Sequence, residues 1–468
     1  MNSINQNFVL RSTRVVTPEG VRDASVVVRD GVICAVISPK EIPSDLPVNN
    51  VGDLVVMPGL VDSHVHINEP GRTEWEGFET ATRAAAAGGI TTLVDMPLNS
   101  TPVTTSVSAL RSKLKAAEGK LTVDCGFYAG VIPENVHDLE PLLDAGVVGA
   151  KAFLIHSGID DFPNVSESDL RRAMPIIVRH NLPLLVHCEL NSDTLTPVPS
   201  PNGRGVAPAN VGDGVRVNAR SYAHYLSSRP RSWEHAAIEL IVRLAREYGC
   251  KVHIVHVSSA DAIPMIRDAK VSGLNITAET CPHYLYFSSE NIPDADTRFK
   301  CAPPIREEEN RNRLWGALRE GVLDCIVSDH SPSTPALKCL DSGDFQKAWG
   351  GIASLQFGLS IVWTEARKRN HSLSDMARWM CDRPARLVDL KRKGRIAPGF
   401  DADFVVWNPE QSFAITKSMI YHRHPVTPYE GQTLGGIVER TILRGQTIYE
   451  RGKGFRERLG QILSRSAR

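Results

Sequence analysis

Apolar and polar positions along the middle of the chain follow a pattern that predicts parallel strands separated by helices. Short apolar runs bounded by turn residues indicate strands, and longer stretches with apolar residues three or four positions apart indicate helices. Strands are predicted over residues 60–66, 91–96, 122–128, 148–154, 184–187, 252–257, 275–279 and 323–328. Helices are predicted over residues 78–87, 166–180, 232–248 and 307–320. Eight such units predict an α/β fold, a (β/α)8 TIM-like barrel, whose catalytic residues follow the carboxyl ends of the strands.

The two ends of the chain have a different pattern, in which strands follow one another without helices. Strands are predicted over residues 8–16, 25–28, 32–37, 402–407 and 439–449. Asp30-Gly31 favours a tight hairpin, because both turn positions need a positive φ, and Arg444-Gly445 interrupts the last strand. We therefore expect a small β-sandwich domain built from both chain termini. Its two parts, residues 1–56 and 391–468, would flank a barrel at residues 57–390.

Charge and composition restrict the possible partners. The 468 residues include 53 basic and 53 acidic side chains, so the balance predicts no binding of nucleic acid or an anionic membrane, and a small-molecule substrate fits better. Nine scattered cysteines indicate a reduced compartment. No apolar run is long enough to cross a bilayer, and the N-terminal residues lack the pattern of a secretory signal. A cytoplasmic location is expected, with an organellar matrix as the alternative.

Residues that suit metal binding follow several of the predicted strands. His64 and His66 are two positions apart near the end of the first strand, so both imidazoles face the same side. Other strand ends carry further groups of this kind, namely Lys151, His187, His256 and Asp329. Taken singly, a histidine there is more often structural and a lysine more often a solvated charge. Their occurrence together at one rim of a barrel favours a metal site.

Longer motifs surround these residues and carry a family resemblance. They are DSHVHINEPGRTEWEGFETATRAAAAGGITT (62–92), DMPLNSTP (95–102), KAF (151–153), VHCE (186–189), HVSS (256–259), ETCPHYL (279–285), CAPPIR (301–306), VSDHSP (327–332), KAWGGIASLQ (347–356) and GRIAPGFDADFVV (394–406). On these motifs the chain resembles the amidohydrolase superfamily, in its cyclic-amidase branch of hydantoinases, dihydroorotases and allantoinases. The resemblance covers nearly the whole chain and is closest to the allantoinase family.

The resemblance implies a centre of two divalent metal ions, usually zinc, although cobalt, manganese or iron suit the same ligands. His64 and His66 would hold one ion and His187 and His256 the other. Lys151 would bridge both, and because an ammonium has no acceptor, the family carboxylates this lysine to N6-carboxylysine. Asp329 is the last of the implied metal ligands and would bind the first ion. It would also act as the catalytic group that moves the proton of a bridging hydroxide.

The choice of substrate depends on weaker signals. By resemblance, Asn99, His283 and the backbone near Ala302 would contact the substrate. Dihydroorotases carry an arginine where this chain has Asn68, and an amide suits a neutral ring better than a carboxylate. We therefore expect hydrolysis of (S)-allantoin to allantoate in purine catabolism. Hydantoin, dihydropyrimidine and dihydroorotate rings are the alternatives within this branch, and a non-catalytic assembling protein is the alternative from another class.

One stretch departs from the pattern of the branch. Residues 190–229 are rich in proline, glycine and polar residues and longer than the branch needs. They are predicted to form a flexible surface insertion, with a substrate lid or a partner loop as the alternative. The resemblance also implies a homodimer or a homotetramer.

Overall fold

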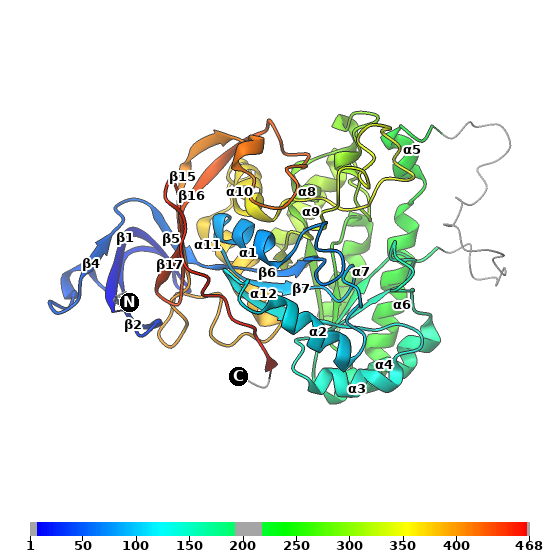
Figure 1. Ribbon diagram of the computed structural model, residues 1–468, viewed down its shortest axis with the longest axis horizontal. Helices are drawn as coiled ribbons and strands as arrows, with labels where there is room; N and C mark the ends of the chain where they lie inside the picture. The colour runs from blue at the N-terminus through cyan, green and yellow to red at the C-terminus, as the bar shows by residue number, and fades with distance from the viewer. Residues whose placement is uncertain (1–6, 192–217, 466–468) are drawn as a thin grey trace.

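The computed structural model describes residues 7–191 and 218–465, and its centre consists of two parallel sheets surrounded by helices (Figure 1). The first sheet has the order β6-β7-β8, from strands Leu60–Val65, Ile90–Asp95 and Asp124–Phe127. The second has the order β14-β13-β12-β11-β10-β9. Its strands are Cys325–Ile326, Ile276–Thr280, Val252–Ile254, Leu184–His187, Ala150–Phe153 and Ala129–Gly130, from β14 to β9. Each of the eight predicted strands is therefore present.

The two parallel sheets contact each other at both pairs of edges. Only Tyr128 separates β8 from β9, and the amide of Val148 donates to the carbonyl of Phe127 at 2.9 Å. At the opposite edge, Val65 pairs in parallel with His330, and the amide of His66 donates to the carbonyl of His330 at 2.8 Å. The ends of β6 and β14 are thereby brought together, although they are far apart in the sequence.

The predicted helices are present with bounds that differ by at most one residue. They are α1 (Phe78–Ala87), α4 (Glu167–Arg179), α6 (Arg231–Tyr248) and α9 (Glu308–Arg319). Further helices between strands are α2 (Val107–Ala117), α3 (Val136–Asp144), α7 (Ile263–Val271) and α10 (Gly358–Lys368). In α4, a capping box of Ser166 and Asp169 starts the helix, and residues such as Leu170 and Ile177 bury its apolar face. None of the described helices is long and apolar enough to cross a membrane.

Strands from both termini form a single nine-stranded sheet, at the left of Figure 1. From the N-terminal side come β1 (Phe8–Thr17), β2 (Gly20–Arg29), β3 (Val32–Ile37), β4 (Val48–Asn50) and β5 (Val55–Pro58). From the C-terminal side come β15 (Phe404–Ala414), β16 (Thr433–Leu443), β17 (Gln446–Glu450) and β18 (Gly454–Phe455). The two sets meet where β5 pairs with β1 and β15. These pairings join all nine strands into one sheet, whereas a sandwich consists of two sheets packed face to face. The β-sandwich therefore stays a prediction.

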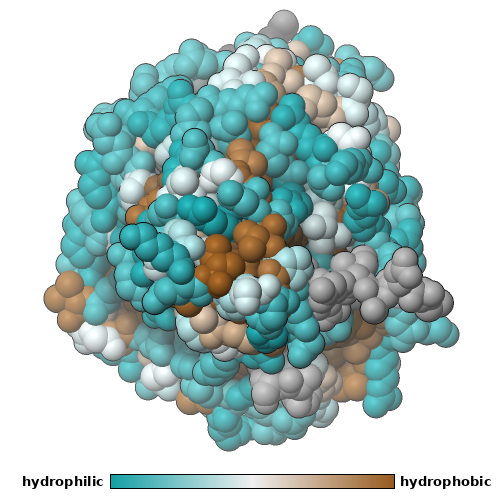
Figure 2. Space-filling view, turned by 90° about the vertical axis from the view of Figure 1, so that its left-hand side faces the viewer, coloured by the Kyte–Doolittle hydropathy of each residue, from teal (hydrophilic) through white to brown (hydrophobic). Residues whose placement is uncertain are grey.

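The hairpin predicted at Asp30-Gly31 is confirmed by its backbone angles, and Arg444-Gly445, predicted only to interrupt the last strand, forms a turn of the same kind between β16 and β17. Asp30 and Gly31 have φ values of 49° and 76°, and Arg444 and Gly445 have values of 45° and 75°. Positive φ at both positions is what a tight hairpin between twisted strands requires. Figure 2 views the molecule from the end that carries the N-terminal strands and shows a largely hydrophilic face with several smaller apolar areas, one of them near its centre.

The predicted insertion is only partly described, since residues 192–217 lie outside the described residues. The prediction of a flexible surface loop is wrong for its last part, where α5 (Tyr222–Ser227) packs against the protein. Tyr222 and Tyr225 are buried, and their hydroxyls donate to the carbonyls of Ile305 at 2.8 Å and Cys301 at 2.6 Å. These two tyrosines anchor the segment to the protein. They could have predicted a packed helix, but the polar residues around them favoured a flexible loop.

A buried ion pair fixes the loop after β6 and leads to a prediction about stability. Lys113 Nζ lies 2.6 Å from Asp95 Oδ2, and Asp95 Oδ1 accepts the amide of Ile67 at 2.8 Å. Lys113→Met leaves the buried Asp95 carboxylate uncompensated and is expected to destabilise the protein by about 3 kcal/mol or more. Urea unfolding measures the effect. Lys115→Met, on the exposed face of the same helix, is the control, and an equal effect of both changes would contradict the prediction.

Candidate metal centre

A first group of potential metal ligands forms where β6 and β14 end. His64 Nε2 and His66 Nε2 lie 3.2 Å and 3.4 Å from Asp329 Oδ1, and these three residues could hold a metal ion. All three are buried. Burial raises the pKa of Asp329, but the imidazoles of His64, His66 and His256 outweigh this and hold it well below its usual range. The group therefore presents two imidazoles around an ionised carboxylate.

A second pair of histidines lies beside this group. His187, at the end of β11, and His256, after β12, approach within 2.9 Å between Nδ1 and Nε2. Burial lowers the pKa of both, so both imidazoles are neutral and each can offer a lone pair. The rings of His64 and His256 are 5.5 Å apart between centroids, which places the pair next to the first group. The four histidines predicted from the sequence therefore lie together.

Lys151, on β10, is fully buried, and its Nζ has no hydrogen-bond partner in the described structure. Burial lowers its pKa to about 8, against the attraction of Glu279 and Asp329. An unpaired buried ammonium is costly, so the position fits an amine that is neutral or covalently modified. An unpaired Nζ near histidines and a carboxylate fits a lysine that would carry a carboxyl group and bind metal ions through it.

Carboxylates that the sequence interpretation assigned no role hold the histidines in place. Glu279, on β13, accepts a hydrogen bond from His64 Nδ1 at 2.5 Å and lies 2.9 Å from His253 Nε2. Glu189 lies 2.8 Å from His187 Nε2. Glu279 lies in the motif ETCPHYL and Glu189 in VHCE, each near the end of a strand. That position is the sequence signal by which these supporting acids could have been identified.

The backbone is strained at several residues of the site. Asn68, Asn99, His256 and Asp329 have φ values of 67°, 69°, 38° and 45°, a region that non-glycine residues rarely occupy. Such conformations persist where the surrounding structure requires them, and they concentrate at functional sites. All four residues lie in the loops that follow strands, after β6, β7, β12 and β14.

The predicted substrate contacts differ in their relation to the metal ligands. Asn99 Nδ2 lies 3.3 Å from His66 Nδ1, and its Oδ1 has no partner among the described residues. His283 is fully buried with both ring nitrogens unpaired there, and it groups with Cys281 and Asp329 as a potential ligand. Burial lowers the pKa of His283 to about 4, so the ring is neutral. No hydrogen bond joins Ala302 to these residues in the described part of the chain.

Comparisons with known proteins agree with this arrangement over almost the whole chain. The profile of the Amidohydrolase family matches residues 55–448. An allantoinase of Streptomyces avermitilis is 50% identical over 459 residues, covering 98% of both chains. An allantoinase of Saccharomyces cerevisiae is 46% identical over 427 residues, covering 90% of this chain and 88% of its own. The solved structure of an L-hydantoinase (dihydropyrimidinase) from Arthrobacter aurescens superposes with a TM-score of 0.87 at 28% identity, covering 98% of this chain and 100% of that one.

Proposed function

This chain belongs to the amidohydrolase family, and from that premise we propose that it hydrolyses the ring amide of (S)-allantoin to allantoate. The observation that carries the proposal is the first group, His64, His66 and Asp329, lying beside the His187–His256 pair. Relatives named as allantoinases, 50% and 46% identical over most of their length, support the choice of ring. The enzyme is a hydrolase of cyclic amides.

We propose that the two parallel sheets close into an eight-stranded (β/α)8 barrel at residues 57–390. The contacts at both pairs of sheet edges support closure. Residues 1–56 and 391–468 would form the β-sandwich, supported by the sheet that they share. A homodimer or homotetramer is proposed on the family resemblance alone.

Two divalent metal ions, zinc in the first instance, would be held by this chain's own side chains. His64, His66 and Asp329 would hold one ion, His187 and His256 the other, and N6-carboxylated Lys151 would bridge them. The unpaired Nζ of Lys151 and the neutral imidazoles fit this assignment. When bound, the ions supply a Lewis acid for the carbonyl and make water a nucleophile near neutral pH.

Asp329 is the proposed catalytic residue. Its carboxylate lies beside His64 and His66, among the proposed metal ligands, where it could accept a proton from the attacking water. As the ring C–N bond breaks, Asp329 returns that proton to the departing nitrogen, which is a poor leaving group as an anion. The buried position of Asp329 keeps bulk water from competing for the proton.

Neutral polar groups are proposed to bind the substrate. The oxygens of Asn68 and Asn99 and both ring nitrogens of His283 are buried without partners among the described residues. Buried polar atoms without partners are costly, so they suit a ligand that offers several amide donors and acceptors, as a ureido-hydantoin does. The backbone at Ala302 is proposed as a further contact on the resemblance alone.

Ring-opening assays on purified, metal-quantified protein test the function. We expect turnover of racemic allantoin to stop near half conversion and to exceed that of hydantoin and dihydroorotate by at least about 100-fold, because a site built to bond polar groups rejects analogues that lack them. If hydantoin were turned over as fast as allantoin, the hydantoinase reaction would replace the allantoinase reaction as the proposed function. No turnover of any ring by metal-loaded protein would overturn the enzymatic proposal.

Asn68→Arg is expected to lower kcat/KM for allantoin by about 10- to 100-fold. The Asn68 amide donates to the carbonyl of Pro332 at 3.3 Å while its oxygen is unpaired, so arginine would remove a neutral acceptor and bring a charge into a buried site. Steady-state kinetics measure the loss. Asn68→Gly is the control for backbone strain, because glycine accepts the φ of 67°. An unchanged kcat/KM in Asn68→Arg would show that this position does not select the ring.

A further inference from the structure

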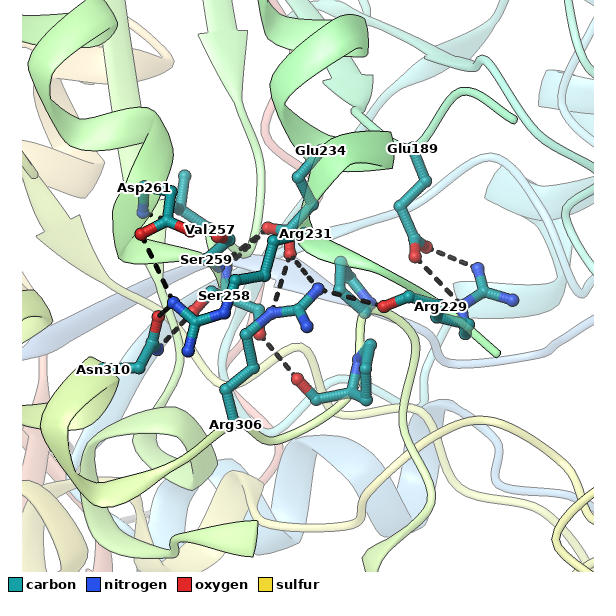
Figure 3. A network of polar contacts seen from close by, with 12 residues as sticks. Glu189, Arg229, Arg231, Glu234, Val257, Ser258, Ser259, Asp261, Arg306 and Asn310 are labelled. Atoms are coloured by element: carbon teal, nitrogen blue, oxygen red, sulfur yellow. Dashed lines mark hydrogen bonds and ion pairs between the residues drawn. The ribbon is translucent and has the colours of Figure 1, made fainter. Parts of the chain in front are cut away.

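Two ion pairs form a polar network that includes Glu189, the carboxylate in contact with His187 (Figure 3). In the first, Arg229 donates to Glu189, with Nε at 2.9 Å from Oε1 and Nη2 bonded to Oε2. In the second, Arg306 Nη2 lies 2.7 Å from Glu234 Oε1, and both of these side chains are only 2% exposed. Arg306 also donates to the carbonyl of Arg229 at 3.3 Å and thereby joins the two pairs into one network.

The first ion pair determines how His187 presents its nitrogens. A carboxylate can only accept hydrogen bonds, so the 2.8 Å contact with Glu189 Oε2 requires the proton of His187 on Nε2. His187 Nδ1 is then unprotonated, and it is the atom that faces His256 Nε2 at 2.9 Å. Arg229 donates to both carboxylate oxygens of Glu189, including Oε2, the oxygen that His187 contacts, and so fixes the carboxylate in position. The pair therefore selects both the tautomer and the orientation of His187.

The second ion pair supports the chain that carries His256. Glu234 Oε2 accepts the amides of Ser258 at 3.0 Å and Ser259 at 2.9 Å, two and three residues after His256 in the sequence. His256 has a strained φ of 38°, so the backbone that follows it needs such anchoring. One network thus reaches both histidines of the pair, one through a side chain and the other through the backbone.

We propose that Glu189, held by Arg229, is a positioning residue that prepares His187 to bind the second metal ion, and that this ion binds weakly when the pair is broken. The inference rests on the two-metal centre of the proposed function. Removal of hydrogen-bond partners of metal-binding histidines lowers metal affinity by about 10- to 100-fold in general. We expect a loss of that size for the second ion and no comparable loss for the first, whose ligand His64 is held by Glu279 instead.

Zinc titration of the metal-stripped full chain against a chromogenic chelator separates these effects. Glu189→Gln and Arg229→Met are each expected to keep one tight site and to weaken the other by about 10- to 100-fold. Arg229→Lys keeps the charge but not the two-point contact and is expected to restore part of the affinity. Cobalt binding, followed by its visible spectrum, gives a second measurement that is independent of activity.

Arg231→Met is the matched control, because Arg231 belongs to the same polar region but contacts neither Glu189 nor His187. It bonds Asp261 at 3.3 Å, Asn310 at 3.1 Å and also Glu307. This variant is expected to bind both ions as the wild type does, while thermal melting records any loss of stability in every variant. A general structural role for the network would lower stability in all of them and leave zinc affinity unchanged.

The outcomes separate this inference from the proposed function. Two tight sites in the wild type together with two tight sites in Glu189→Gln and Arg229→Met overturn the positioning role alone. Fewer than two sites in the wild type overturn the two-metal centre, and the inference with it. If Glu189→Gln fails to fold, Arg229→Met and Arg229→Lys decide, since wild-type zinc affinity at both sites in those two variants also overturns the positioning role.

Discussion

Replacing Lys151 with alanine is expected to remove both bound metal ions and the hydrolytic activity together. The Nζ of Lys151 is fully buried without a partner among the described residues, next to the groups proposed to bind both ions. Its carbamate would be the one ligand common to the two sites. Since metal ions supply several kcal/mol of transition-state stabilisation, turnover should fall by about 1,000-fold or more. Metal analysis and steady-state kinetics on the same sample measure both losses.

A matched control and a rescue experiment make the Lys151 prediction specific. Lys338 is another buried lysine, but it donates to the carbonyls of Lys300 at 2.8 Å and Trp349 at 3.0 Å and binds none of the proposed ligands. Lys338→Met is expected to lower stability and to keep both metal ions. Short carboxylic acids should restore part of the activity of Lys151→Ala by supplying the missing oxygens. Full activity and full metal content in Lys151→Ala would show that Lys151 is not the ligand that the two ions share.

The sequence was sufficient to predict the strands, the family and the reaction class, because each of these depends on local patterns. The spacing of His64 and His66 places both imidazoles on one side, and the structure brings them to Asp329. The family and the activity inferred from the long motifs are confirmed by the family profile and by allantoinases of similar length. Parallel strands end at the same edge of a sheet, so residues that are distant in the sequence lie together there. For this reason the residues at strand ends predicted the candidate site.

The ends of the strands were predicted less well, because side chains distant in the sequence decide them. The strand predicted over 252–257 ends at Ile254, before His256 takes a positive φ. The strand predicted over 323–328 ends at Ile326, and the amide of Ser328 donates to the carboxylate of Asp62 instead of to a neighbouring strand. Glu279 supports His64 across 215 positions of sequence, a contact that no local pattern predicts.

Asp329→Asn is expected to reduce turnover by about 100- to 10,000-fold, the usual contribution of a positioned general base. Asparagine keeps the shape of the side chain and one oxygen that can bind a cation, but it cannot accept the proton from water. The loss should therefore appear in kcat more than in KM, with the first metal ion retained. Asp324→Asn is the control, since Asp324 bonds Lys270 at 2.6 Å and the amide of Ala278 at 2.8 Å, away from the proposed ligands. An unchanged kcat in Asp329→Asn would assign the proton transfer to another group, and loss of the first ion would show that Asp329 acts mainly as a ligand.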